Sequence, residues 1–166
     1  MREPVIVAQS SDNRAVTDSA AGWSYLFVLG IGLAVVGLVD AVLLFIPAHW
    51  SSLEWEFGTV AGMFDAMPLL AIGIGLMTAA SVANDWALSR KLMVAVTLLL
   101  TVLVVVLSLV FALDVAPILK ATGDQASKDV LKMAALKTGL MAMTYTVLYL
   151  ALGVWTWRRL RVKKGA

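Results

Sequence analysis

Cysteine is absent from this chain of 166 residues, histidine occurs once, and charged residues make up only 14% of the sequence. Without cysteine the chain forms no disulfide, no thiolate metal site and no thiol redox couple, which excludes membrane oxidoreductases that work through paired cysteines. The single histidine, His49, lies outside the long apolar runs, so haem or chlorophyll held by histidine inside a bilayer is not expected. We therefore predict no cofactor.

The motifs of common catalytic sites are also missing. His49 has Glu54 and Glu56 as its neighbouring acids, which falls short of the three or four ligands that protein-bound divalent metals usually require. The chain has no phosphate-binding glycine loop between a strand and a helix, no arrangement of serine with histidine and no HExxH pair. We predict no metal site and a protein that is not an enzyme.

Apolar residues, in contrast, are abundant. They account for 61% of the chain, and the mean hydropathy is +0.90, whereas about half is usual for a soluble domain. A helix needs about 20 apolar residues to cross the hydrocarbon core of a bilayer, and runs of that length occur four times. We predict an all-α integral membrane protein with four transmembrane helices in an up-down bundle. The predicted parts are a polar segment at 1–22, a transmembrane domain at 23–157 with spans at about 23–46, 57–82, 92–113 and 135–157, and a basic tail at 158–166.

The distribution of lysine and arginine predicts the orientation in the membrane. With the N-terminus in the cytoplasm, nine of the 13 basic residues lie on the inner side and four on the outer side, in line with the positive-inside rule. We predict a bacterial-type inner membrane location with both termini cytoplasmic. The basic tail either binds anionic lipid or anchors this topology. Tryptophan favours membrane interfaces, and the predicted lipid-interface residues are Trp23, Trp86, Trp155, Trp157, Arg158 and Arg159 on the inner side and Trp50 and Trp55 on the outer side.

The segment 116–136, between the third and fourth spans, mixes apolar residues with three lysines and two aspartates. Its apolar residues return at helical spacing, so we predict an amphipathic helix that lies on the outer surface of the membrane. A solvated loop followed by a helical extension of the fourth span is the alternative interpretation.

Two aspartates lie inside the predicted spans, where an ionisable side chain costs about 2.5 to 3.5 kcal/mol at the helix centre. Asp40 precedes Ile46 by six residues, which places it roughly 9 Å below the outer boundary at 1.5 Å per residue. Asp65 follows Phe57 by eight residues, roughly 12 Å below the same boundary. Because consecutive spans run in opposite directions, the two carboxylates are expected at similar depth.

Small residues mark the faces through which the helices are expected to pack. Gly30 and Gly37 fall on one stripe of the first span, and Gly58 and Gly62 form a GxxxG spacing in the second. Helices approach closely at such faces. Asp65 projects between Gly58 and Gly62, so we expect it to look into a helix interface rather than at lipid.

Ser108, Thr144 and Tyr145 are the predicted polar partners of Asp40 and Asp65, because they fall near the same depth. One interpretation is a proton or cation site, since paired carboxylates at membrane depth serve proton relays and coupled carriers. Another is structural: the acids are protonated or hydrogen-bonded and hold helices together, at about 1 kcal/mol. A third is that the acids meet a basic or polar group on another subunit.

These features predict a non-catalytic integral membrane subunit that assembles with or stabilises a larger membrane protein complex. Small-residue faces, an aliphatic third span and little mass outside the membrane offer surfaces more than chemistry. The expected partners are other integral membrane subunits or further copies of this chain, together with the lipid bilayer, and no nucleic acid. The alternative is a small proton-coupled or cation-coupled carrier or channel in which Asp40 and Asp65 titrate.

Overall fold

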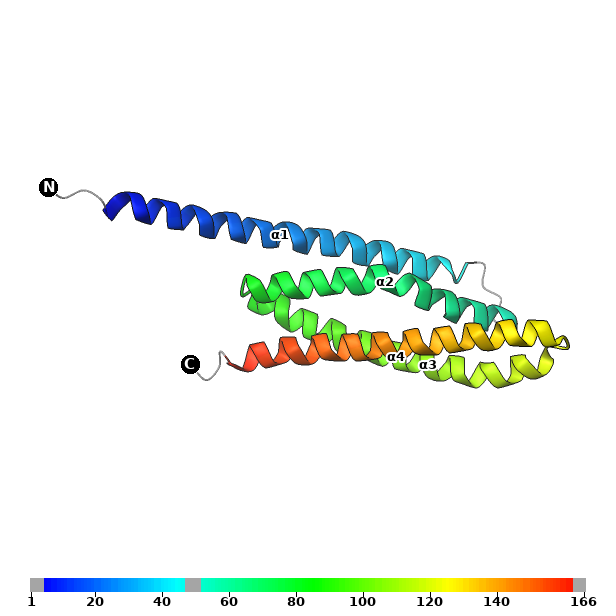
Figure 1. Ribbon diagram of the computed structural model, residues 1–166. Helices are drawn as coiled ribbons and strands as arrows, with labels where there is room; N and C mark the ends of the chain where they lie inside the picture. The colour runs from blue at the N-terminus through cyan, green and yellow to red at the C-terminus, as the bar shows by residue number, and fades with distance from the viewer. Residues whose placement is uncertain (1–4, 47–51, 163–166) are drawn as a thin grey trace.

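The computed structural model describes the backbone of residues 5–46 and 52–162 and the side chains of residues 21–46, 52 and 55–161. This part of the chain is helical and contains no strand (Figure 1). Each helix includes a stretch long and apolar enough to span a membrane, which confirms the predicted all-α class and the prediction of four long apolar helices. The helices are α1 (Val5–Leu43), α2 (Leu53–Ala83), α3 (Ala87–Ala121) and α4 (Gln125–Val162).

The prediction of a separate surface helix at 116–136 is wrong. Residues 116–121 continue α3, residues 122–124 form a turn, and residues 125–136 begin α4. The turn falls at this point because Thr122 and Gly123 are poor helix formers and Asp124 favours a new helix start. The alternative interpretation, a helical extension of the fourth span, is correct.

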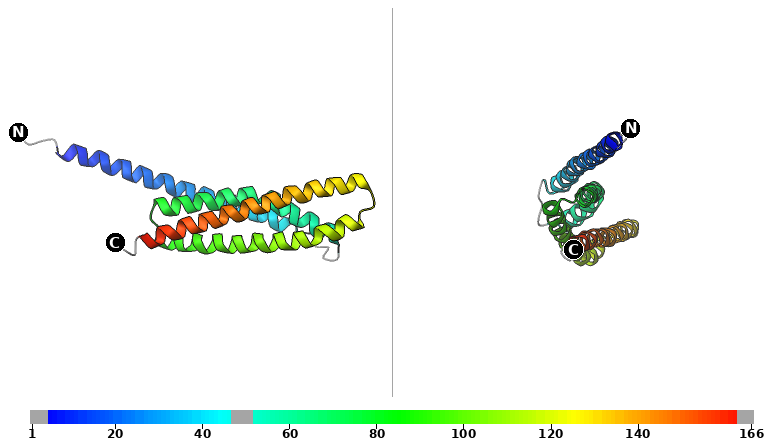
Figure 2. Two further views of the ribbon diagram at one scale, coloured as in Figure 1. Left: turned by 60° about the horizontal axis from the view of Figure 1, so that its bottom comes forward. Right: turned by 90° about the vertical axis from the view of Figure 1, so that its left-hand side faces the viewer.

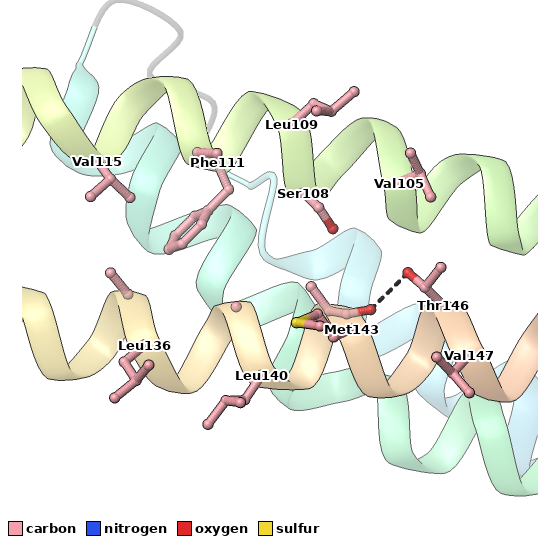
Figure 3. A pocket seen from close by; sticks show the side chains of 14 residues that line it. Val105, Ser108, Leu109, Phe111, Val115, Leu136, Leu140, Met143, Thr146 and Val147 are labelled. Atoms are coloured by element: carbon pink, nitrogen blue, oxygen red, sulfur yellow. Dashed lines mark hydrogen bonds between the residues drawn. The ribbon is translucent and has the colours of Figure 1, made fainter.

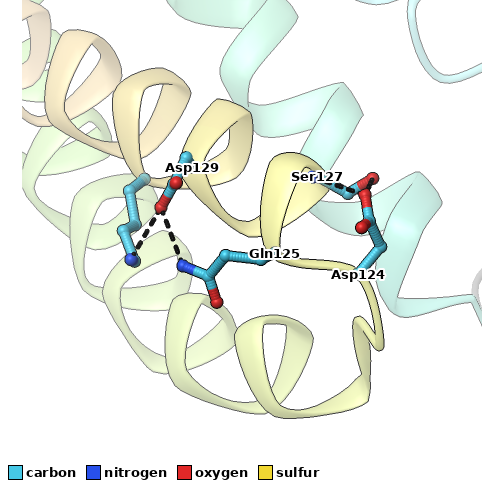
Figure 4. Close-up of polar contacts among 5 residues, drawn as sticks. Asp124, Gln125, Ser127 and Asp129 are labelled. Atoms are coloured by element: carbon cyan, nitrogen blue, oxygen red, sulfur yellow. Dashed lines mark hydrogen bonds and ion pairs between the residues drawn. The ribbon is translucent and has the colours of Figure 1, made fainter.

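Asp124 caps the N-terminus of α4 (Figure 4). Its carboxylate accepts hydrogen bonds from the backbone N–H of Ser127 at 3.1 Å and from the Ser127 hydroxyl at 3.2 Å. These bonds favour the charged carboxylate, so they lower the pKa of Asp124 below its usual value. In the next turn, Asp129 accepts hydrogen bonds from Lys132 at 2.9 Å and from the Gln125 side chain at 3.3 Å. The start of α4 is thus held by its own polar side chains.

A tight turn joins α2 to α3. Asp85 has a φ of 58°, the left-handed conformation in which many helices end, and aspartate is one of the few residues besides glycine that adopts it readily. The amide of Trp86 donates to the Ser81 carbonyl at 3.1 Å and the amide of Asp85 to the Val82 carbonyl at 3.3 Å, as in a Schellman cap. Asp85 also forms an ion pair with Arg90 at 2.7 Å, which ties the turn to the first turn of α3.

The central helix of the fold is α2 (Figure 1, Figure 2). It packs against α1 on one side and against α3 and α4 on the other, whereas α1 packs against α2 alone among the described helices. Of the apolar stretches, 44% of α2 is buried but only 17% of α1 and of α3. The exposed apolar faces of α1 and α3 therefore require lipid or another protein around them.

The apolar core lies between α2, α3 and α4. Phe64, Val104 and Tyr149, one from each of these helices, are fully buried. Phe57 of α2 stacks on Phe111 of α3 with ring centroids 4.8 Å apart, a favourable arrangement for two aromatic rings. These contacts hold the three helices together as one unit, onto which α1 is attached.

The α1·α2 seam is made by backbone contact. A Cβ atom on Gly73 of α2 would lie 2.6 Å from the backbone nitrogen of Ala34 and 2.6 Å from the carbonyl oxygen of Gly30. A Cβ atom on Gly37 of α1 would lie 2.6 Å from the backbone nitrogen of Leu70. No side chain fits within such distances, so glycine is required where the two helices touch.

An aromatic pair closes each end of this seam. Phe27 of α1 meets Trp86, in the turn between α2 and α3, edge-on with ring centroids 5.3 Å apart. Phe45, two residues beyond the end of α1, meets Trp55 of α2 edge-on at 6.2 Å. Aromatic rings prefer this edge-to-face geometry at such separations. The apolar length of α1 is thereby held near both ends of α2 and along its glycine stripe.

Candidate functional site

The acid predicted in the second span is joined to the fourth helix. The Asp65 carboxylate of α2 accepts a hydrogen bond from the Lys137 ammonium of α4, with Oδ1 and Nζ 2.7 Å apart. A hydrogen bond between two charged groups at this distance is among the stronger polar contacts in proteins. The side chains of Asp65 and Lys137 are 56% and 59% exposed, so the pair lies at the surface of the three-helix unit rather than in its core.

Two tyrosines of α4 lie one helical turn apart. The ring of Tyr145 stacks with that of Tyr149 at a centroid separation of 6.4 Å. The buried Tyr149 hydroxyl donates to Sδ of Met67 on α2 at 3.9 Å. A thioether is a weak acceptor, so the contact between Tyr149 and Met67 contributes mainly packing.

The structure does not pair Asp40 with Asp65. Asp40 is exposed on α1, and within the described residues its carboxylate makes no hydrogen bond or ion pair, whereas Asp65 has Lys137. Because α1 packs against α2 alone, the side of α1 that carries Asp40 faces no other described helix. Asp65 therefore belongs to an ion pair between two helices, whereas Asp40 is a separate, exposed carboxylate.

Two of the predicted polar partners hydrogen-bond to their own helices. The Ser108 hydroxyl donates to the Val104 carbonyl at 2.6 Å, and the Thr144 hydroxyl donates to the Leu140 carbonyl at 2.8 Å. Such bonds to the preceding turn satisfy a hydroxyl without help from a neighbouring helix. Tyr145 packs on Tyr149, and within the described residues it makes no hydrogen bond to Asp65, whose partner is Lys137.

The four predicted packing glycines differ in their surroundings. Gly30 and Gly37 touch the backbone of α2, as described above. A Cβ atom on Gly62 would meet the side chain of Leu44, just beyond the end of α1, at 3.1 Å, and one on Gly58 would meet nothing within 4 Å. The glycine of α2 that receives α1 most closely is Gly73, which follows the GxxxG pair by eleven residues.

The predicted interface residues of α4 include two stacked pairs of arginine and tryptophan. The Arg161 guanidinium lies 4.0 Å from the centre of the Trp157 ring, and that of Arg159 lies 6.0 Å from the centre of the Trp155 ring. Arg158 is exposed beside them. Cation–π contacts of this kind hold the rings and the charges at the end of the helix.

Of the other predicted interface tryptophans, Trp55 and Trp86 lie near helix ends. They pack on Phe45 and Phe27 as described, and Trp86 is 38% exposed. Trp23 is half-buried at the start of the apolar part of α1. Trp50 lies outside the described residues.

The sequence pattern does not reveal a buried polar cluster at the α2–α3 turn. Arg90 is only 5% exposed and pairs with Asp85, while Ser81 and Ser89 share a hydrogen bond of 2.6 Å. The Thr78 hydroxyl is buried nearby in α2 and has no hydrogen-bond partner within the described part of the chain. In the sequence, Arg90 is simply a basic residue between two apolar runs, since the pattern of one helix does not show which neighbour covers it.

Asp114 is a third acid inside an apolar helix. It directly follows Leu113, where the predicted third span ends, but α3 continues beyond it. Its Oδ2 atom is buried and, among the described residues, has no hydrogen-bond partner. A count of acids within the predicted spans misses Asp114 by one residue, because span boundaries inferred from hydropathy are the least certain part of such a prediction.

An apolar groove of about 730 Å³ lies between α3 and α4 (Figure 3). One wall is formed by α3 between Val105 and Val115, and the other by α4 between Ala135 and Val147. Ser108, one of the predicted polar residues, is part of this lining. The groove has room for a ligand between the two helices.

The described residues offer interactions between helices more than reactive groups. Among the described side chains, those of residues 21–46, 52 and 55–161, no three His, Asp or Glu side chains gather as a metal site would require, and His49 lies outside these ranges. Comparisons with protein-family models, with curated proteins and with solved structures find no match to this chain. The function is therefore inferred from the residues and their arrangement.

Proposed function

We propose that the chain is an integral membrane protein whose four helices cross a bacterial-type inner membrane up and down, and that it serves as a non-catalytic subunit of a larger membrane complex. The length and hydropathy of the four helices support insertion. The excess of lysine and arginine on one side supports cytoplasmic termini. The stacked arginines and tryptophans at the end of α4 suit the inner interface.

Two helices give the same register for the bilayer. Lys137 precedes Trp157 by 20 residues of α4, about 30 Å at 1.5 Å per residue. Asp65 precedes Ala83, the end of α2, by 18 residues, about 27 Å. Both distances match the hydrocarbon thickness of about 30 Å. With Trp157 and the α2–α3 turn at the inner boundary, the ion pair of Asp65 and Lys137 lies near the outer edge of the hydrocarbon, where each charge compensates the other.

The exposed carboxylate of Asp40 is the observation that carries the proposal. Asp40 follows Trp23 by 17 residues of α1, about 26 Å, which places it at the same depth as Asp65, near the outer edge of the hydrocarbon, but, within the described residues, without a partner such as Lys137. Ionisable side chains at such depth almost always face a helix interface or a water-filled cavity. Asp40 is exposed on a helix that packs against α2 alone. An ionisable side chain that faces lipid at this depth is costly. A second polypeptide that covers this side of α1 would shield the Asp40 carboxylate from lipid.

We call this surface the Asp40 face and define it as Leu29, Val36, Asp40 and Leu43, which helical geometry places on one side of α1. Its three apolar members are 53%, 50% and 56% exposed. The face suits another apolar helix that brings a hydroxyl, amide or basic side chain to the carboxylate. The exposed side of α3 differs, because residues 92–113 contain no charge, so lipid alone can cover it.

The native assembly, extracted in mild detergent from its own membranes, tests this proposal. Native mass spectrometry is expected to show the chain in a fixed ratio with one or more other membrane proteins. Asp40→Leu makes the face fully apolar and should reduce the bound partner at least tenfold, because the polar contact is lost while lipid still covers the face. The control Asp65→Asn removes the other acid and should leave the partner bound.

A wild-type chain that is found alone, or a partner that binds the Asp40→Leu variant undiminished, would contradict the proposal. The carrier hypothesis makes a different prediction for the same two variants. If Asp40 and Asp65 titrate during transport, each substitution should abolish proton uptake by vesicles that contain the chain, whether or not a partner is present.

A further inference from the structure

The groove between α3 and α4 presents an almost entirely apolar surface (Figure 3). Its two hydroxyl groups are already used: Ser108 donates to the Val104 carbonyl at 2.6 Å and Thr146 to the Ala142 carbonyl at 2.8 Å. The other lining side chains are apolar. A ligand in this groove would gain close packing but no hydrogen bonds, which suits a hydrocarbon chain.

The groove also has the length and depth of one half of the hydrocarbon core. Val105 and Val115 are ten residues apart in α3, about 15 Å. Val147 precedes Trp157 by ten residues, which puts the inner end of the groove about 15 Å from the inner boundary, and Ala135 lies about 33 Å from it. In a core of about 30 Å, the groove runs from the middle of the bilayer to its outer boundary.

Lysines stand above the outer end of the groove. Lys132 and Lys128 precede the lining residue Leu136 by four and eight residues, so they continue the same row of side chains along α4. Lys132 precedes Trp157 by 25 residues, about 38 Å, at the level of the outer headgroups in a bilayer about 40 to 45 Å thick overall. Its side chain is 55% exposed.

We propose that an anionic phospholipid of the outer leaflet binds at this place, with one acyl chain in the groove and its phosphate on Lys132. The charged residues around the α3–α4 turn are three lysines and two aspartates, namely Lys120, Lys128, Lys132, Asp124 and Asp129. The excess positive charge favours an anionic headgroup. The long apolar stem of a lysine also suits the boundary between headgroups and hydrocarbon.

Gly139 allows the groove to be filled without disturbing the fold. A Cβ atom on Gly139 would meet nothing within 4 Å, although this residue lines the groove. Gly139→Leu should therefore place a side chain in the space of the acyl chain. Gly32→Leu is the matched control, because Gly32 also has nothing within 4 Å of its Cβ position but lies on α1.

The experiment counts the phosphatidylglycerol molecules that stay bound to the purified full chain in detergent, by native mass spectrometry, with phosphatidylcholine as the neutral comparison. Wild type and Gly32→Leu should retain phosphatidylglycerol, and Gly139→Leu should lose it at least tenfold. Circular dichroism should show unchanged helix content for both variants. Retention by Gly139→Leu equal to that of wild type would overturn the acyl-chain site.

Two further variants test the headgroup. Lys132→Gln should abolish the preference for phosphatidylglycerol over phosphatidylcholine. Asp129→Asn removes the counter-ion that lies 2.9 Å from Lys132, so it should increase that preference several-fold. Wild type that binds both lipids equally would overturn the assignment of an anionic ligand. If Gly139→Leu instead changes the oligomeric mass and leaves bound lipid unchanged, the groove holds a second copy of the chain and the proposal is wrong.

Discussion

The two outer seams of this fold are built in opposite ways. Along α1·α2 the backbones themselves meet, because glycines on both helices leave no room for a side chain, as the 2.6 Å distances around Gly73 show. Along α3·α4 branched and aromatic side chains keep the helices apart and enclose a groove of about 730 Å³. Glycine seams close by contact of the main chain, whereas side-chain seams leave room that another molecule can fill.

This difference assigns different roles to the two exposed helices. Because α1 is fixed to α2 by glycines and by an aromatic pair at each end, it presents the Asp40 face in one orientation. A rigid apolar face with a single carboxylate suits a specific protein partner. The exposed side of α3 lacks charge over 92–113, and the groove beside it suits lipid.

The largest effect is expected from placing a bulky side chain in the glycine seam between α1 and α2. Gly73→Leu should push α1 away from α2, since its Cβ would lie 2.6 Å from two backbone atoms that cannot move aside. Overpacking of this kind costs about 1 to 3 kcal/mol of unfolding free energy. Spin labels on Tyr25→Cys and Leu88→Cys, both exposed sites, should report a longer and broader distance. In Gly75→Leu, where nothing lies within 4 Å of the Cβ position, the distance should match that of the wild type.

A smaller effect is expected from the tight point of the other seam. A Cβ atom on Gly153 of α4 would lie 3.0 Å from Oγ1 of Thr97, a side chain that can shift. Gly153→Leu should therefore cost about 1 kcal/mol, at the low end of overpacking. Gly139→Leu, on the same helix but in the open groove, should leave the unfolding free energy in mixed detergent micelles unchanged or raised. If Gly153→Leu and Gly139→Leu lowered the unfolding free energy equally, the α3·α4 seam would have no open groove at Gly139.

The ion pair between Asp65 and Lys137 should contribute less still. Both side chains are more than half exposed, and exposed ion pairs are worth about 0.2 to 1 kcal/mol. A double-mutant cycle with Asp65→Asn and Lys137→Gln, read as unfolding free energy, should give a coupling in this range that shrinks as salt is raised. A coupling of zero at low salt would show that the 2.7 Å contact does not join α2 to α4 energetically.

The smallest effect concerns the cap of α4. Folding lowers the pKa of Asp124 below its usual 3.8, through hydrogen bonds from Ser127. Its contribution to stability is therefore complete above pH 3.8 and is lost as the pH falls through the lower, folded value. As the pH falls through that range, hydrogen exchange of the Ser127 amide should become faster in the wild type than in the Asp124→Asn variant. Asparagine also caps helices, but it does not titrate. Identical pH profiles for the two proteins would exclude this linkage.

The sequence predicts the positions of the helices well, but it predicts poorly which helix faces pack against each other. Length and hydropathy fix the number of helices, because the apolar runs are separated by turns such as the one at Asp85. Small-residue spacing identifies the stripe with Gly30 and Gly37 on α1, but it cannot show that this stripe meets Gly73 rather than Gly58 or Gly62. A spacing rule describes one helix, whereas a seam depends on two.

The same limit applies to the candidate site. Asp65 is recognisable as an acid in an apolar helix, and Lys137 is recognisable as a basic residue near the outer end of the fourth span. Their 2.7 Å contact depends on α2 lying beside α4, which no local pattern encodes. Asp114 is not identified from the sequence as an acid within a span, because the uncharged apolar run ends at Leu113, while α3 continues to Ala121.

Site-specific photocrosslinking in the native membrane tests the central claim most directly. A benzophenone amino acid replaces Val36 on the Asp40 face, 50% exposed, or Leu99 on the charge-free side of α3, 68% exposed. The account predicts a discrete protein adduct from position 36, which disappears in the Asp40→Leu background, and only lipid adducts from position 99. Lipid adducts alone from both positions would contradict the claim that a partner subunit covers the Asp40 face.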